Sequence, residues 1–268
     1  MRWTVLAAAL LALTTALGIQ PARASITIDL TAETRVDTVV TVKVSAANHG
    51  TEPAHEVQPE VRIRGETQQR ERIAILAPGD THVWEASTAV PADPGFFPIE
   101  VLVRYADANA YPLSALLVQV ARTPGASAGP ATVTVGRTQV ATSGAVRVTV
   151  GNPGPRPLAG RVSLMLPAEF QTAQASQPLD VPAQGTAAIS VPIENAGALP
   201  GSTYPTYAVF EYEAGDFHQA AVGSVGVEVV ATSTTRLPLV VGAIALVVAL
   251  AALGATLLLV RRGRAISS

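Results

Sequence analysis

The sequence predicts an all-β protein with two tandem antiparallel β-sandwich domains, a signal peptide before them and one transmembrane helix after them. Three observations predict this organisation. Short stretches in which Val, Ile and Thr alternate with polar residues fill the middle of the chain, and Gly, Pro, Asn and Asp separate them. The same motifs occur there twice in the same order, and an uncharged apolar run lies near each end.

Residues 1–24 have the parts of a signal peptide. Arg2 supplies the positive start, residues 4–18 are uncharged and rich in Ala and Leu, and Ala22 and Ala24 are the small residues that a signal peptidase reads. Cleavage is therefore expected between Ala24 and Ser25. A retained N-terminal anchor is the weaker alternative, because the apolar run is shorter than the roughly 20 residues that a bilayer span requires.

The second apolar run, residues 237–260, is long enough to cross a bilayer. Only a helix satisfies the backbone groups inside hydrocarbon, so we expect a transmembrane helix here. Arg261, Arg262 and Arg264 follow directly, which places residues 261–268 in the cytoplasm and the middle of the chain outside it. These expectations describe a single-pass protein of the cell membrane, with its ectodomain in the periplasm or at the cell surface.

The middle of the chain is predicted to be two copies of one unit, because three segments match in order. The matched pairs are 44–50 (VSAANHG) with 148–154 (VTVGNPG), 76–81 (LAPGDT) with 181–186 (VPAQGT), and 94–111 with 200–217. A repeat of this kind sets domain boundaries better than a composition shift does. It predicts sandwiches at residues 25–121 and 131–231, joined by a Gly- and Pro-rich linker at 122–130.

The repeat also pairs residues whose expected roles are structural: Asn48 with Asn152, Gly79 with Gly185, and Tyr105 with Tyr212. The asparagines are expected to turn the chain after a strand, since Asn adopts the left-handed backbone region at low cost. The glycines are expected in the turn between two further strands. Each tyrosine is expected to bury its ring while its hydroxyl reaches a backbone acceptor at the edge of the sandwich.

This order of strand, N-x-G turn, strand, L-x-P-G turn and final hairpin resembles the CARDB group of bacterial and archaeal β-sandwich domains. The resemblance covers residues 25–120 and 131–230, and the second copy has Ala183-Gln184-Gly185 where the group has Pro-Gly. It implies an immunoglobulin-like fold and a role in adhesion, spacing or carbohydrate association. The group has no catalytic residues, so the resemblance assigns none to this chain.

The residue content excludes several kinds of chemistry. The chain has no cysteine, which excludes disulfides, thiolate metal sites and thiol nucleophiles. Its net charge of -2 gives no field that would attract nucleic acid. Its four histidines show no zinc-site spacing, and no G-x-S-x-G segment is present. We therefore predict a protein that is not an enzyme and uses no cofactor.

Two weak binding candidates remain open. Glu211, Glu213 and Asp216 surround the final hairpin and offer oxygen ligands for calcium, although a turn with Asp and Gly needs no ion. Five aromatic residues are candidates for a sugar-binding platform: Trp84, Phe96, Phe97, Tyr204 and Tyr207. Of these, Trp84 is instead expected in the core. No ligand-binding residue follows from the sequence alone.

The leading hypothesis is a non-enzymatic, membrane-anchored binding or spacer protein at the envelope of a bacterium. Its expected partners are the bilayer, through residues 237–260, and an envelope protein or polysaccharide that contacts loops or a strand edge. The alternative is an accessory subunit of a membrane transport, secretion or envelope-assembly complex. The fold does not choose between them.

Overall fold

The computed structural model describes residues 25–231, which form strands and connecting loops without a helix. No helix of sufficient length and hydropathy to cross a bilayer occurs in this part of the chain. The predicted signal peptide with Ala22 and Ala24, the expected transmembrane segment at 237–260, and the arginines of the tail lie outside the described residues. For residues 25–231, the prediction of an all-β fold with antiparallel sheets is confirmed.

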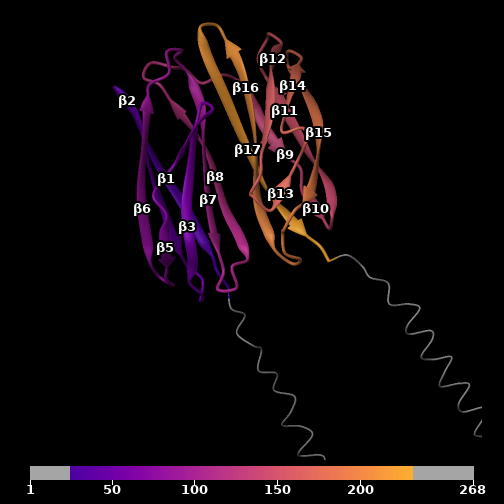
Figure 1. Cartoon of the computed structure of the whole chain (residues 1–268). Coiled ribbons are helices and arrows are strands. Elements are labelled where there is room, and N and C mark those ends of the chain that lie inside the picture. Colours follow the sequence, from indigo (N-terminus) through magenta and orange to yellow (C-terminus); the bar gives the residue numbers. More distant parts are fainter. Residues whose placement is uncertain (1–24, 232–268) are drawn as a thin grey trace, which may run out of the picture. The chain divides into compact units, whose positions relative to one another are not determined.

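The first eight strands form two sheets that face each other across an apolar core (Figure 1). One sheet has the order β1-β2-β6, and the other has the order β4-β3-β7-β8 with β5 also paired to β3. All pairs in both sheets are antiparallel. The strands are β1 (Ile28–Val36), β2 (Val39–Asn48), β3 (Ala54–Ile63), β4 (Glu66–Gln69), β5 (Ile73–Leu76), β6 (Thr81–Ala89), β7 (Phe96–Ala106) and β8 (Pro112–Arg122).

The other nine strands form a second pair of sheets, with the orders β10-β17-β16-β12-β14 and β13-β15-β11-β9 (Figure 1). The pair β10 and β17 is parallel, whereas the other pairs of these two sheets are antiparallel. The strands are β9 (Thr132–Val135), β10 (Thr138–Val140), β11 (Ser143–Asn152), β12 (Leu158–Met165), β13 (Phe170–Gln171), β14 (Ser176–Val181), β15 (Gly185–Asn195), β16 (Thr203–Ala214) and β17 (Phe217–Val229).

The alternating segments of the sequence become strands with one buried face. Every second residue of β2 and of β11 points into a core: Val40, Val42 and Val44 in β2, and Val146, Val148 and Val150 in β11. All six side chains are fully buried. The alternation therefore produces a buried face because successive side chains of a strand point to opposite sides of the sheet.

Asn48 and Asn152 make the same three hydrogen bonds at the ends of β2 and β11. The Asn48 amide donates to Glu52 O (2.9 Å) and Leu76 O (3.0 Å), and its Oδ1 accepts from Gly50 N (2.9 Å). The corresponding partners of Asn152 are the carbonyls of Arg156 and Pro182 and the amide of Gly154.

These contacts explain why asparagine stands at positions 48 and 152, and the explanation differs from the one predicted. Neither residue has a positive φ, so the predicted left-handed turn conformation is wrong at both positions. Both side chains are instead buried, and each forms hydrogen bonds with three backbone groups, two carbonyls and one amide. Asn is suited to this role because its amide both donates and accepts.

The predicted pairing of Gly79 with Gly185 is wrong by one residue. Gly185 pairs with Asn152, and Asp80 takes the same place opposite Asn48 in the first sandwich. Gly79 therefore corresponds to Gln184. Both residues have a positive φ, 83° and 52° respectively, so the second turn places a residue with a side chain in the left-handed region.

Replacing Gln184 by Gly should stabilise the protein by about 0.5–1 kcal/mol. A side chain in the left-handed region costs about 1 kcal/mol, and part of this gain is lost to the greater freedom of glycine in the unfolded chain. Urea unfolding measures the difference. The exposed Gln174, which does not have a positive φ, provides the control: its replacement by Gly should lower stability or leave it unchanged. Destabilisation by Gln184→Gly would contradict the strain argument.

Candidate functional site

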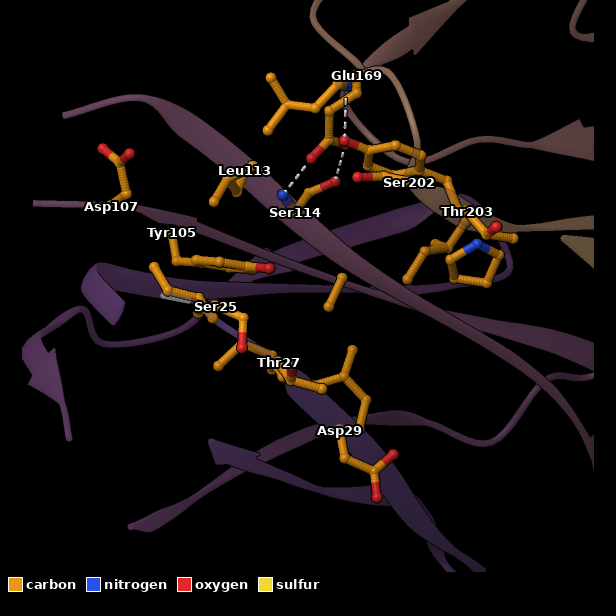
Figure 2. A pocket seen from close by; sticks show the side chains of 18 of the residues that line it. Ser25, Thr27, Asp29, Tyr105, Asp107, Leu113, Ser114, Glu169, Ser202 and Thr203 are labelled. Atoms are coloured by element: carbon orange, nitrogen blue, oxygen red, sulfur yellow. Dashed lines mark hydrogen bonds between the residues drawn. The ribbon is translucent and has the colours of Figure 1, made fainter. Parts of the chain in front are cut away.

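A cavity of about 810 Å³ lies where residues of the two sandwiches meet. The first sandwich contributes residues 25–30, which include the start of β1, together with Glu52 and the residues flanking the hairpin between β7 and β8. The second sandwich contributes Glu169 and residues 202–205 at the start of β16. Figure 2 shows the side chains that line this space.

Glu169 is bound to the first sandwich by two short hydrogen bonds (Figure 2). Ser114 donates to it twice, from its backbone amide to Oε1 (2.6 Å) and from its hydroxyl to Oε2 (2.5 Å). The Ser114 hydroxyl in turn accepts from Ala168 N (2.9 Å). Both carboxylate oxygens thus act as acceptors, which is the arrangement of an ionised carboxylate. Glu169 is only 3% exposed.

An apolar strip continues this contact along the facing strands. Leu102 of β7, Leu116 and Val118 of β8, and Val209 of β16 are buried together. Three half-buried side chains pack against them: Met165, Tyr207 and Ala220. Strand β7 is consequently buried on both faces over most of its length, since its other face belongs to the core of the first sandwich.

A second set of contacts joins the sandwiches at their backbones. Gly95 pairs with His218, and His218 N donates to Pro94 O (3.1 Å). A Cβ atom on Gly95 would overlap the carbonyl group of His218, so only glycine permits this approach. The Tyr111 hydroxyl also donates to Gly197 O (2.5 Å) across the junction.

Tyr105 and Tyr212, which the repeat pairs, have different surroundings. The Tyr105 hydroxyl points into the cavity (Figure 2), and burial together with the nearby charge of Glu169 raises its pKa. The Tyr212 ring stacks on Phe210, and its hydroxyl accepts from Ala131 N (3.2 Å). For Tyr212, the bonded backbone group is therefore a donor, not the acceptor that the sequence predicted.

Acidic groups at the rim add to the charge of Glu169. Asp107 accepts hydrogen bonds from the amides of Tyr111 and Asn109 (both 2.8 Å) in the hairpin after β7. These bonds, with the amide of Tyr111 as the largest influence, lower the pKa of Asp107 and keep it ionised. Asp29 also lines the cavity, and the described lining residues include no Lys, Arg or His.

The three calcium candidates do not converge on one point. Glu211 and Glu213 lie on either side of the His218 ring, with distances of 3.2 Å to Nε2 and 2.8 Å to Nδ1. Asp216 lies in the turn between β16 and β17. Among residues 25–231, no three His, Asp or Glu side chains are arranged to hold a metal ion. The sequence analysis did not identify His218 as the partner of these carboxylates, although the two-residue turn makes it the strand partner of Glu213.

The charge of His218 should make stability depend on pH. Hydrogen bonds from the ring to Glu211 and then Glu213 raise its pKa above the usual value of about 6.5, although burial opposes them. The stabilisation is therefore complete below the pKa of the unfolded chain and is lost as pH rises through the folded pKa. Between pH 6 and pH 9, the free energy of unfolding of the wild type should fall by up to about 1 kcal/mol relative to that of His218→Gln, as measured by urea unfolding. Glu211→Gln should make this fall smaller. If the stability advantage of the wild type over His218→Gln grew with pH, the proposed role of His218 would be contradicted.

The aromatic residues do not form an exposed platform. Trp84 and Phe97 are in the core of the first sandwich, as expected for Trp84, whose ring donates to Glu71 O (2.8 Å). Phe96 is half-buried on the opposite side of the strand. Tyr204 is buried with its hydroxyl accepting from Leu199 N (3.0 Å), and Tyr207 belongs to the apolar strip.

No model of a known protein family matches the chain, and no curated protein is similar to it in sequence. Among solved structures, the chain is similar to red sea bream transglutaminase, with 14% identity over 78% of this chain and 32% of that one and a TM-score of 0.29. It is also similar to Salmonella alpha-2-macroglobulin reacted with methylamine, with 13% identity over 76% of this chain and 16% of that one and a TM-score of 0.30. For trypsin-activated alpha-2-macroglobulin from Escherichia coli, the identity is 12% over 79% of this chain and 18% of that one, and the TM-score is 0.30. The chain spans about a third of the transglutaminase and under a fifth of each macroglobulin. TM-scores this low carry no argument about function.

Proposed function

We propose that the chain is a non-enzymatic protein that presents two CARDB-like β-sandwiches outside the cytoplasm as one binding or spacer unit. Residues 237–260 anchor it in the cell membrane, and residues 261–268 remain in the cytoplasm. Its partners are proteins or polysaccharides of the cell envelope, which contact its loops or a strand edge.

The buried contact between the sandwiches is the observation that supports a single unit. Domains joined by a linker alone move independently. Here the apolar strip, the Glu169–Ser114 pair and the Gly95–His218 backbone contact act together. The linker is also held, because Gln219 accepts from Gly129 N (2.8 Å) and donates to Ser127 O (3.0 Å). A fixed junction of this kind would allow the two sandwiches to act as one rigid spacer.

Spin labels test whether the unit is fixed. The chain has no cysteine, so the pair Ser87→Cys and Ser190→Cys labels one exposed site on each sandwich without background. The reference pair, Thr31→Cys with Ser87→Cys, lies within one sheet. A distance distribution across the sandwiches as narrow as that of the reference pair supports the proposal. A broad distribution would show that the modules move independently, which contradicts it.

Cysteine labelling tests the membrane topology separately. A membrane-impermeant maleimide added to spheroplasts should label Ser87→Cys, because this position is expected outside the cytoplasm. It should not label Ser267→Cys in the tail until the membrane is permeabilised. Labelling of Ser267→Cys without permeabilisation, or protection of Ser87→Cys, contradicts the anchored arrangement.

A further inference from the structure

We propose that the cavity between the sandwiches binds a small organic cation through an alkylated ammonium group, which contacts Tyr105 and Glu169. This inference goes beyond an anchored spacer. It rests on the fixed arrangement of the two sandwiches, because each supplies one of the two groups. The spin-label distance tests that arrangement on its own, so a mobile junction and an empty cavity give different results.

The negative charge of the cavity lining favours a cationic ligand. Glu169 is buried, both of its carboxylate oxygens accept hydrogen bonds from the neutral residue Ser114, and the described lining residues include no basic side chain. A buried carboxylate without a positive partner attracts a cation more strongly than an exposed one does. Asp29 and Asp107 at the rim extend the negative potential to the entrance.

Tyr105 favours an alkylated ammonium ion over a metal ion. Its hydroxyl points into the cavity (Figure 2), and within residues 25–231 it forms no hydrogen bond. The ring beside a carboxylate is an arrangement that favours alkylated ammonium ions, because such ions are weakly hydrated and are attracted to aromatic faces. A strongly hydrated metal ion would instead need several oxygen ligands around one point, and residues 25–231 contain no cluster of three acidic or histidine side chains that could hold one.

The size and the rim define the ligand further. A volume of about 810 Å³ is within the range of small-molecule sites. Cleavage after Ala24 would leave an α-ammonium at Ser25, which also lines the cavity and whose N lies 3.1 Å from Thr51 Oγ1. Four carboxylates line the same space, those of Asp29, Glu52, Asp107 and Glu169, so the lining keeps an excess of negative charge. Their charge disfavours a phosphodiester, so the ligand is a free ammonium compound and not a phosphocholine headgroup.

Calorimetric titration of the full-length chain in mild detergent tests the proposal with defined probes. Choline should bind with a Kd of about 5 mM or tighter. The neutral isostere 3,3-dimethylbutan-1-ol, in which carbon replaces the charged nitrogen, should bind at least about 10-fold more weakly, because it keeps the shape and loses the charge. Glycerophosphocholine should also bind more weakly than choline. Equal binding of choline and its isostere, no choline binding, or tighter binding of glycerophosphocholine would each overturn the proposal.

Two substitutions connect binding to the named residues. Tyr105→Leu and Glu169→Gln should each weaken choline binding by at least about 5-fold, because one removes the aromatic face and the other removes the charge. Asp180→Asn, on the exposed edge strand β14, is the matched control and should leave the Kd unchanged. Spin-label distances for each variant show whether the junction is intact. An intact Tyr105→Leu variant with unchanged choline affinity would overturn the assignment.

Discussion

Replacing Asn48 by Asp should lower the free energy of unfolding by about 3 kcal/mol, although the two side chains have nearly the same shape. The Nδ2 atom of Asn48 donates to two carbonyl oxygens, at 2.9 and 3.0 Å. A carboxylate oxygen in its place cannot donate and repels both carbonyls, while the buried position keeps water away. Urea unfolding monitored by tryptophan fluorescence measures the loss in the first sandwich.

The second sandwich supplies a matched test of the same contact. Asn152→Asp should cause a similar loss, because Asn152 donates to two carbonyl oxygens at 2.7 and 3.1 Å. Gln174→Glu is the control, since it makes the same amide-to-acid change at an exposed loop residue and should alter stability by less than about 0.5 kcal/mol. Tolerance of aspartate at both asparagine positions would refute the proposed role of the two amides.

Replacing Glu169 by Ala should cost about 3 kcal/mol and separate the unfolding of the two sandwiches. The substitution leaves the Ser114 amide and hydroxyl without the acceptors that they have in the folded chain. Hydrogen bonds to a buried charged group contribute more than neutral ones, so this pair is a large part of the coupling at the junction. Scanning calorimetry should show one cooperative transition for the wild type and two for the variant.

Two further variants show how the coupling depends on the acceptor oxygens of Glu169. Glu169→Gln keeps one acceptor oxygen, so it should lower the free energy of unfolding by less than Glu169→Ala does. Asp180→Ala removes an exposed carboxylate and should leave a single transition within about 0.5 kcal/mol of wild type. A single unchanged transition for Glu169→Ala would contradict a large contribution of the Glu169–Ser114 pair to the coupling.

Local pattern was sufficient for the strands and for one matched position of the repeat, the two asparagines. Alternation in residues 39–46 and 145–150 predicts buried valines because side-chain direction in a strand depends only on the parity of the position. The pairing of Asn48 with Asn152 was visible from their neighbours as well. The reason for their presence was not visible, since the carbonyls that they bind belong to segments that fold back from as far as 28 and 30 residues away.

The turn at Gln184 shows the limit of motif matching. Aligning the glycines placed Gly185 opposite Gly79, because glycine is the residue that such a turn favours. Strand register decides the true correspondence, and register depends on hydrogen bonds across the sheet. Gln184 therefore occupies the strained position, and the adjacent glycine does not relieve it.

The sequence by itself determined the class of fold, the faces of the strands and the apolar ends of the chain, because these depend on the order and spacing of nearby residues. Only the tertiary structure decided that Glu169 meets Ser114 across 55 residues, that the outer face of β7 is covered, and that Tyr105 points into a cavity. Glu169 lies in a loop with no pattern of its own. Its role arises from two surfaces that come together only when both sandwiches have folded, and no local periodicity records that contact.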